Sequence, residues 1–139
     1  MTDVAERVKT YQQFINGEWV DSASGETIEV ENPADEQVIA QVQASGAEDV
    51  DRAANAAEAA FETWGKTTPQ ERSLALLKLA DAIEARADEL GRLESKNAGK
   101  PVAAAIDEIP VMVDNLRFFA GAARLLEGKA ANEYMEGHT

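Results

Sequence analysis

The chain has 139 residues, of which 45% are hydrophobic, and this length permits a single globular domain. It holds 13 Lys and Arg against 26 Asp and Glu, and the resulting formal net charge of −13 repels nucleic acid and anionic membranes. No cysteine occurs, which excludes disulfides, thiolate metal sites and a cysteine nucleophile within the chain.

The acidic residues are spread along the chain and form no tail. This distribution favours adaptation to high salt, where screening relieves self-repulsion, over an acidic surface for one partner. A melting temperature that rises from dilute to molar KCl would be the sign of such adaptation. The first ten residues are polar and no apolar run approaches the length of a membrane span, so we expect a soluble, cytoplasmic protein without a signal peptide.

Short strands and turns are predicted for the first 42 residues, which form a small antiparallel β element. The strongest signal is Asn16-Gly17, which supplies both positive-φ positions of a type I′ hairpin turn between β-rich flanks. The expected parts are a mobile N-terminal end at 1–10, a hairpin at 14–20, a turn at Ser24-Gly25, strands at 27–30 and 38–42, and a break at 32–35.

Three helices are predicted in the next part of the chain. Ser45 and Glu48 have the spacing of a capping box and start the first helix. The Thr-Pro-Gln-Glu motif at 68–71 starts the second, with an N-cap threonine and a proline in the first turn. A break near 86–88 separates it from a shorter third helix, which Gly99 closes in a left-handed conformation.

The stretch from Asp107 to Gly128 predicts the helix around which the chain is organised. A short helical turn at 103–106 precedes it. Pro110 fits its first turn, where a missing N–H costs little, and Gly128 is placed to close it. Apolar side chains recur at helical spacing on more than one face, so the helix requires cover on several sides. We therefore expect a central helix on which the earlier helices pack.

Two polar groups are candidates for binding. Glu94, Asn97 and Lys100 lie near a Gly-Pro turn and would hold an ion or a phosphate, unless they are only a solvated helix end. Asp107, Glu108 and Asp114 would line a cation pocket, with Asp107, Val111 and Asp114 on one helix face, unless they are helix-start charge and surface solvation.

The remaining notable side chains carry no catalytic pattern. His138 has no second His and no Cys with which to form a metal or nucleophile set, so we interpret it as a loop residue. Trp19 and Trp64 fall in a hairpin and at a helix end, where aromatic side chains are usually buried, so we expect them in the core.

From Phe14 to Thr139 the chain resembles the N-terminal part of an aldehyde dehydrogenase, because several segments occur in that family's order and spacing. The opening β segment is FINGEWVDSASGETIEVENPADEQVIAQV, and the first helices are SGAEDVDRAANAAEAAFETW and TPQERSLALLKLADAIEARADELGRLESKNAGKP, which ends in the family's GKP turn. DEIPVMVDNLRFFAGAAR and EYMEGHT are most similar to the branch that handles aminobutyraldehyde and betaine aldehyde.

The resemblance implies an α/β fold: a mainly helical segment with a small β element, belonging to a Rossmann-type cofactor domain that is incomplete in these residues. It implies that residues 11–139 are one truncated part of an enzyme that uses NAD or NADP. The dinucleotide site, the nucleophilic cysteine, the general-base glutamate and the oxyanion-hole asparagine would all lie outside this chain, which alone would be inactive. The partners would be the remainder of the subunit, against which the helix from Asp107 would lie, and further subunits in a dimer or tetramer.

Two sites follow from the resemblance. The start of the central helix would line the substrate tunnel with Asp107, Glu108, Val111 and Met112, and an acidic wall would suit a cationic amino-aldehyde. A structural monovalent cation would be held by the backbone of Val30 or Glu31 and the side chain of Asn97, where some relatives have Asp.

Two alternatives stay open at this point. One is a self-contained helical interaction module without catalysis, and the absence of cysteine agrees with it. The other is part of a CoA-acylating semialdehyde dehydrogenase, whose discriminating residues would lie outside this chain.

Overall fold

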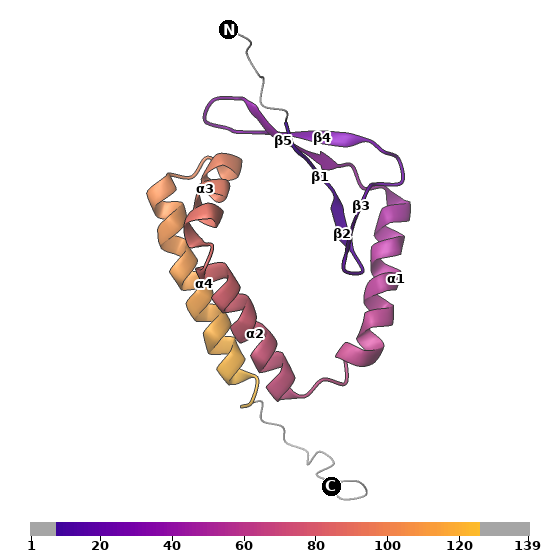
Figure 1. The fold of residues 1–139 in the computed structure, drawn as a ribbon, viewed down its shortest axis with the longest axis vertical. Coiled ribbons are helices and arrows are strands. Elements are labelled where there is room, and N and C mark those ends of the chain that lie inside the picture. Colours follow the sequence, from indigo (N-terminus) through magenta and orange to yellow (C-terminus); the bar gives the residue numbers. More distant parts are fainter. Residues whose placement is uncertain (1–7, 126–139) are drawn as a thin grey trace, which may run out of the picture.

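The computed structural model describes residues 8–125, in which five strands precede four helices. Figure 1 shows the strands and the first helix on one side and the other three helices on the opposite side, joined by the segment after the first helix. The elements are β1 (Thr10–Tyr11), β2 (Gln13–Ile15), β3 (Glu18–Val20), β4 (Thr27–Glu31), β5 (Val38–Gln43), α1 (Ala47–Trp64), α2 (Pro69–Glu84), α3 (Ala87–Ala98) and α4 (Val102–Ala122).

The hairpin between β2 and β3 is confirmed. Asn16 and Gly17 have φ values of 54° and 81°, as the type I′ turn requires, and Phe14 pairs with Trp19 across the strands. The second turn is also present, with Gly25 at a φ of 70° and its N–H donating to the carbonyl of Ser22 over 3.1 Å.

The predicted antiparallel β element is present, but the sheet also contains one parallel pair that the sequence did not indicate. β5 lies between β4 and β1, and it pairs antiparallel with β4 but parallel with β1, with Thr10 opposite Gln41. A strand of two residues is too short to show an alternating pattern of apolar and polar residues. Parallel strands that pair across 31 residues are also not joined by a tight turn, so no turn motif in the sequence marks the pairing. Thr10 thus begins a strand, whereas residues 1–7 of the expected mobile end lie outside the described residues.

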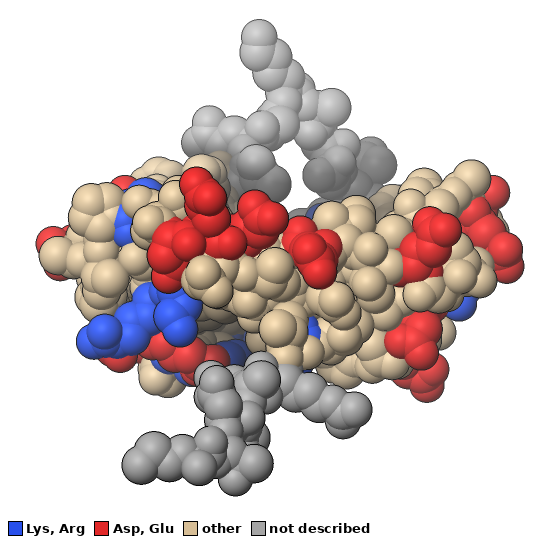
Figure 2. Space-filling view, turned by 90° about the horizontal axis from the view of Figure 1, so that it is seen from above, with Lys and Arg blue, Asp and Glu red and all other residues tan. Residues whose placement is uncertain are grey.

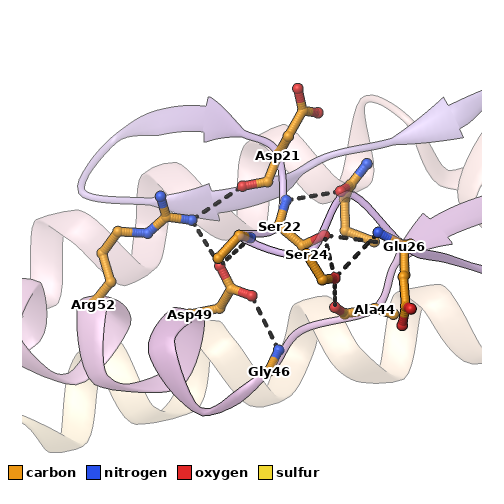
Figure 3. A network of polar contacts seen from close by, with 10 residues as sticks. Asp21, Ser22, Ser24, Glu26, Ala44, Gly46, Asp49 and Arg52 are labelled. Atoms are coloured by element: carbon orange, nitrogen blue, oxygen red, sulfur yellow. Dashed lines mark hydrogen bonds and ion pairs between the residues drawn. The ribbon is translucent and has the colours of Figure 1, made fainter.

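The predicted cap of α1 is displaced by one residue. The N-cap is Gly46 rather than Ser45, and Asp49 rather than Glu48 takes the N–H of Gly46 on its Oδ2 over 3.0 Å. The reason is that Oδ1 of the Asp49 carboxylate also accepts hydrogen bonds from the backbone N–H of Ala23, with 3.0 Å between the heavy atoms, and from Nη2 of Arg52 over 2.9 Å. Figure 3 shows the carboxylate between Gly46 and Arg52. These contacts join α1 to the turn after β3 and select the register of the cap.

The signals around α2 and α3 are confirmed. The hydroxyl of Thr68 accepts from the N–H of Glu71, whose carboxylate accepts the N–H of Thr68 at 2.7 Å. α2 ends at Glu84, and α3 ends at Gly99, which has a φ of 72° and donates its N–H to the carbonyl of Ser95.

The predicted bounds of the central helix are wrong at both ends. α4 begins at Val102 and includes the expected separate turn, so Pro110 lies in its interior. An interior proline removes one backbone hydrogen bond, but Ile109 and Val113 on either side of it are buried, and their packing keeps the helix continuous. α4 ends at Ala122, and Gly128 lies outside the described residues.

The core lies between α4 and the two helices beside it. Ala80 of α2 packs with Ile109 and Val113 of α4, and half-buried apolar side chains surround them. α3 approaches α4 closely at Gly91, where a Cβ atom would lie 2.9 Å from the Cα of Ile106. α2 and α3 therefore pack on α4 as predicted, whereas α1 lies on the other side in Figure 1 and contacts β2.

Large apolar side chains remain exposed on several elements. On α4, Phe118 and Phe119 are 66% and 59% exposed, and they meet edge to face. Trp19 and Trp64 are 64% and 50% exposed, so the prediction that they lie in the core is wrong for the described residues. The apolar periodicity of the sequence thus marks faces that residues 8–125 do not cover themselves.

Candidate functional site

A cavity of about 770 Å³ lies between the three-stranded sheet and the helices α3 and α4. Its walls are mainly apolar, from Tyr11 and Val30 on the sheet side to Ile109 and Met112 on α4. Its charged and amide groups are Glu94, Asn97 and Glu108. Such an apolar cavity with a few polar groups is the usual form of a small-molecule site.

The joint between sheet and helices positions Asn97 in this cavity. Gly99 follows α3 in the left-handed region and packs under the Asn-Pro turn after β4. A Cβ atom at position 99 would lie only 2.8 Å from Cγ of Pro33, so this close approach requires glycine on steric as well as conformational grounds. This contact links the end of α3 to the turn after β4, and Asn97 and Val30 both line the cavity.

A second hollow of about 460 Å³ runs along α4 and shares Glu108 and Met112 with the first. Val111 and Phe119 complete its apolar wall, together with Asn115 and Leu116. Glu108 and Met112, at i and i+4 on one helix face, therefore stand between the two spaces.

The structure brings together most of the site residues expected from the sequence. Glu108, Met112, Val30 and Asn97 line the larger cavity, and Val111 joins the first two in the smaller one. The candidate residues that line neither of these two cavities are Lys100 and the exposed Asp107, Glu31 and Asp114. His138 lies outside the described residues.

An ion pair that sequence reasoning missed lies beside the larger cavity, between Glu108, which lines the cavity, and Lys100, which does not. The Nζ of Lys100 donates to Oε2 of Glu108 over 2.5 Å and lies 4.0 Å from Oε1 of Glu94. The hydrogen bond to Glu108 raises the pKa of the Lys100 ammonium, and burial opposes this effect. A spacing of eight residues across a turn is not a helical i, i+4 pair, so no local pattern signals the contact.

The acidic side chains do not form a multivalent metal centre within residues 8–125. No group of three or more His, Cys, Asp or Glu side chains gathers there closely enough to hold a metal ion. A monovalent cation held by backbone and amide oxygens at Val30 and Asn97 stays a prediction. In the same residues, no helix has the length and apolarity that a membrane span requires.

Residues 19–139 match the sequence profile described as the Aldehyde dehydrogenase family. The chain belongs to the aldehyde dehydrogenase family. It is 42% identical over 122 residues to an acetaldehyde dehydrogenase of Pseudomonas aeruginosa, covering 87% of this chain and 24% of that protein. It is 44% identical over 113 residues to an α-ketoglutaric semialdehyde dehydrogenase of Bacillus subtilis, covering 81% of this chain and 23% of that protein.

Solved aldehyde dehydrogenases have the same fold over this region. The NAD-dependent aldehyde dehydrogenase from Sinorhizobium meliloti superimposes with a TM-score of 0.84 at 38% identity, over 93% of this chain and 26% of that chain. An NAD⁺ complex of a Bacillus cereus aldehyde dehydrogenase gives a TM-score of 0.83 at 41% identity, and the match covers 88% of this chain and 26% of that chain. The chain thus spans about a quarter of the length of the relatives it matches.

These aldehyde dehydrogenase relatives confirm the predicted family and fold, including a β element and helices that form only part of a larger domain. They do not favour the alternative of a module without enzyme ancestry. Their names cover different aldehydes, from acetaldehyde to malonate semialdehyde, so the expected aminobutyraldehyde and betaine aldehyde branch is not decided by them.

The chain lacks one sequence signature of a dinucleotide site. The G-x-G-x-x-G fingerprint that brings a backbone close to a pyrophosphate requires two glycines one residue apart. The nine glycines of the chain include no such pair. That NAD or NADP binds outside these 139 residues stays a prediction.

Proposed function

We propose that the chain is the N-terminal part of an NAD(P)-dependent aldehyde dehydrogenase that oxidises an aldehyde to a carboxylic acid. The observation that carries the proposal is the position of Glu108 and Met112 between two cavities, on the face of α4 where the resemblance places the substrate tunnel. The chain would form part of the tunnel wall. It holds no cysteine nucleophile, so the covalent chemistry belongs to other residues of the complete subunit.

The proposed substrate is a cationic aldehyde of the amino-aldehyde or betaine aldehyde type. The larger cavity has two carboxylates, Glu94 and Glu108, and one ammonium, that of Lys100, beside them. The sum is one net negative charge next to apolar walls, which favours a positively charged tail.

We also place the monovalent cation at the backbone of Val30 or Glu31 and the amide of Asn97, near the joint at Gly99.

The proposed partner of the chain is the remainder of the same subunit, in an enzyme that forms a dimer or tetramer. The exposed apolar faces of α4, α1 and the β2–β3 hairpin support this proposal, because each needs cover.

Figure 2 shows Asp and Glu side chains scattered over the face seen from above, which supports the proposed adaptation to high salt.

A chimera tests the proposed function directly. In it, this chain replaces its counterpart in the Sinorhizobium meliloti aldehyde dehydrogenase, which supplies the rest of the subunit. We expect the chimera to oxidise butyraldehyde with reduction of NAD⁺, measured by absorbance at the nicotinamide band, and the chain alone to be inactive. A soluble, folded chimera that oxidises no aldehyde would refute the proposal.

A further inference from the structure

Lys100 lies beside the two carboxylates that line the larger cavity, and its own side chain is not part of the cavity wall. Its Nζ lies 2.5 Å from Oε2 of Glu108 and 4.0 Å from Oε1 of Glu94. The lysine side chain is 31% exposed, compared with 49% for Glu94 and 62% for Glu108. The same ammonium can thus serve two acceptors, and only Glu108 accepts a hydrogen bond from it in this arrangement.

This geometry changes the role of Glu108. A carboxylate that is already paired with an internal ammonium attracts a substrate cation less strongly than a free one does. Lysine has a flexible four-carbon stem and three donors, so its Nζ can move from one carboxylate to the other and stay paired. Oε1 of Glu94 lies 4.0 Å from Nζ of Lys100, which is close enough for Glu94 to become its partner.

We propose that Lys100 is a specificity-determining residue, an exchangeable counter-ion that pairs with Glu108 and moves to Glu94 when a cationic aldehyde tail binds Glu108. This inference rests on the proposed function and defines how its site admits two classes of aldehyde. With a neutral tail, Lys100 stays on Glu108 and neutralises that part of the wall. With a cationic tail, the ammonium of the substrate replaces that of Lys100, and both carboxylates are paired.

The test compares two aldehydes of equal size in the chimera: 3-aminopropionaldehyde and butyraldehyde. The quantity measured is the ratio of their kcat/KM values. Lys100→Met frees Glu108, so we expect this ratio to rise about threefold to fivefold, through KM, as for other partly exposed ion pairs. Glu94→Gln removes the alternative partner of Lys100, so the ratio should fall by a similar factor. Lys100→Arg keeps the charge and should leave the ratio nearer to that of the parent.

A purely structural role of Lys100 gives a different result, because loss of folding lowers kcat/KM for both aldehydes alike. An unchanged ratio in Lys100→Met, with butyraldehyde still oxidised, would overturn the specificity role and leave the proposed function intact. A chimera that oxidises neither aldehyde would defeat the proposed function, and this inference with it.

The ion pair itself is measured on the 139-residue chain, independently of catalysis. Titration of ¹³C-labelled lysine side chains by NMR gives the pKa of Lys100. We expect this pKa to fall in Glu108→Gln and to fall less in Glu94→Gln, because the hydrogen bond to Glu108 is the larger contribution. An identical pKa of Lys100 in the parent chain and in Glu108→Gln would overturn the proposal.

Discussion

Replacing Gly91 with alanine is expected to lower the free energy of unfolding by about 2 kcal/mol. Gly91 is buried where α3 crosses α4, and a Cβ atom there would lie 2.6 Å from Cγ1 and 2.9 Å from Cα of Ile106. A side-chain atom can rotate away, but the Cα belongs to the backbone of α4, so the two helices must separate. This separation outweighs the gain of about 1 kcal/mol that alanine brings within a helix.

Gly121 provides the matched control for this prediction. It also lies in a helix, α4, but a Cβ atom at position 121 would meet no atom within 4 Å. Gly121→Ala should therefore raise the free energy of unfolding by about 0.5–1 kcal/mol. Urea titration followed by circular dichroism measures both variants. Equal stabilisation by the two substitutions would show that α3 and α4 are not packed closely at Gly91.

Replacing Asp49 with alanine is expected to lower the melting temperature by about 10 °C. The carboxylate is 2% exposed and accepts hydrogen bonds from the backbone N–H groups of Gly46 and Ala23 and from Arg52. Alanine leaves these donors without their acceptor at the joint between α1 and the turn after β3 (Figure 3). Asp51→Ala is the control, because Asp51 lies two residues after Asp49 in α1 and its side chain is exposed. This variant should melt close to the parent chain.

The same carboxylate gives the stability a defined pH dependence. The hydrogen bond from the N–H of Gly46 is the main cause that holds the pKa of Asp49 below its ordinary value of 3.8. The hydrogen bond from Ala23 and the charge of Arg52 act in the same direction, whereas burial of the carboxylate raises the pKa. The stabilisation is complete above that value and is lost as the pH falls through the lower folded-state pKa. Acid titration should show a steeper loss of stability below pH 3.8 in the parent than in Asp49→Asn. Identical acid profiles would contradict this assignment.

The parts of the fold that the sequence predicted correctly each depend on a few adjacent residues. Asn16-Gly17 turns the hairpin by its own backbone preference, the motif at 68–71 caps α2 with its own side chains, and Gly99 ends α3 because only glycine adopts that conformation readily. None of these features needs information from a distant part of the chain.

The errors arose where distant residues decide the local structure. The N-terminus of α1 is set by the contact of Asp49 with Ala23, and β1 is set by pairing with β5. Pro110 stays within α4 because the buried side chains beside it pack on α2 and α3. In each case tertiary contacts outweigh a correct local preference.

For the candidate site, the sequence points to residues that line one cavity but not to the contacts between them. The family resemblance implies site roles for Glu108, Met112 and Asn97, and these three residues line one cavity. The pairing of Glu108 with Lys100 depends on how the turn at Gly99 directs α4 back along α3, which no spacing in the sequence encodes. The sequence grouped Lys100 with Glu94 and Asn97 instead.

The apolar face around Phe118 and Phe119 is the proposed contact surface for the rest of an aldehyde dehydrogenase subunit. The most direct measurement is ANS fluorescence of the isolated 139-residue chain, combined with size-exclusion chromatography. We predict strong ANS binding and self-association, both reduced in the double variant Phe118→Ser, Phe119→Ser. A compact monomer of the parent chain that binds no ANS would contradict the claim.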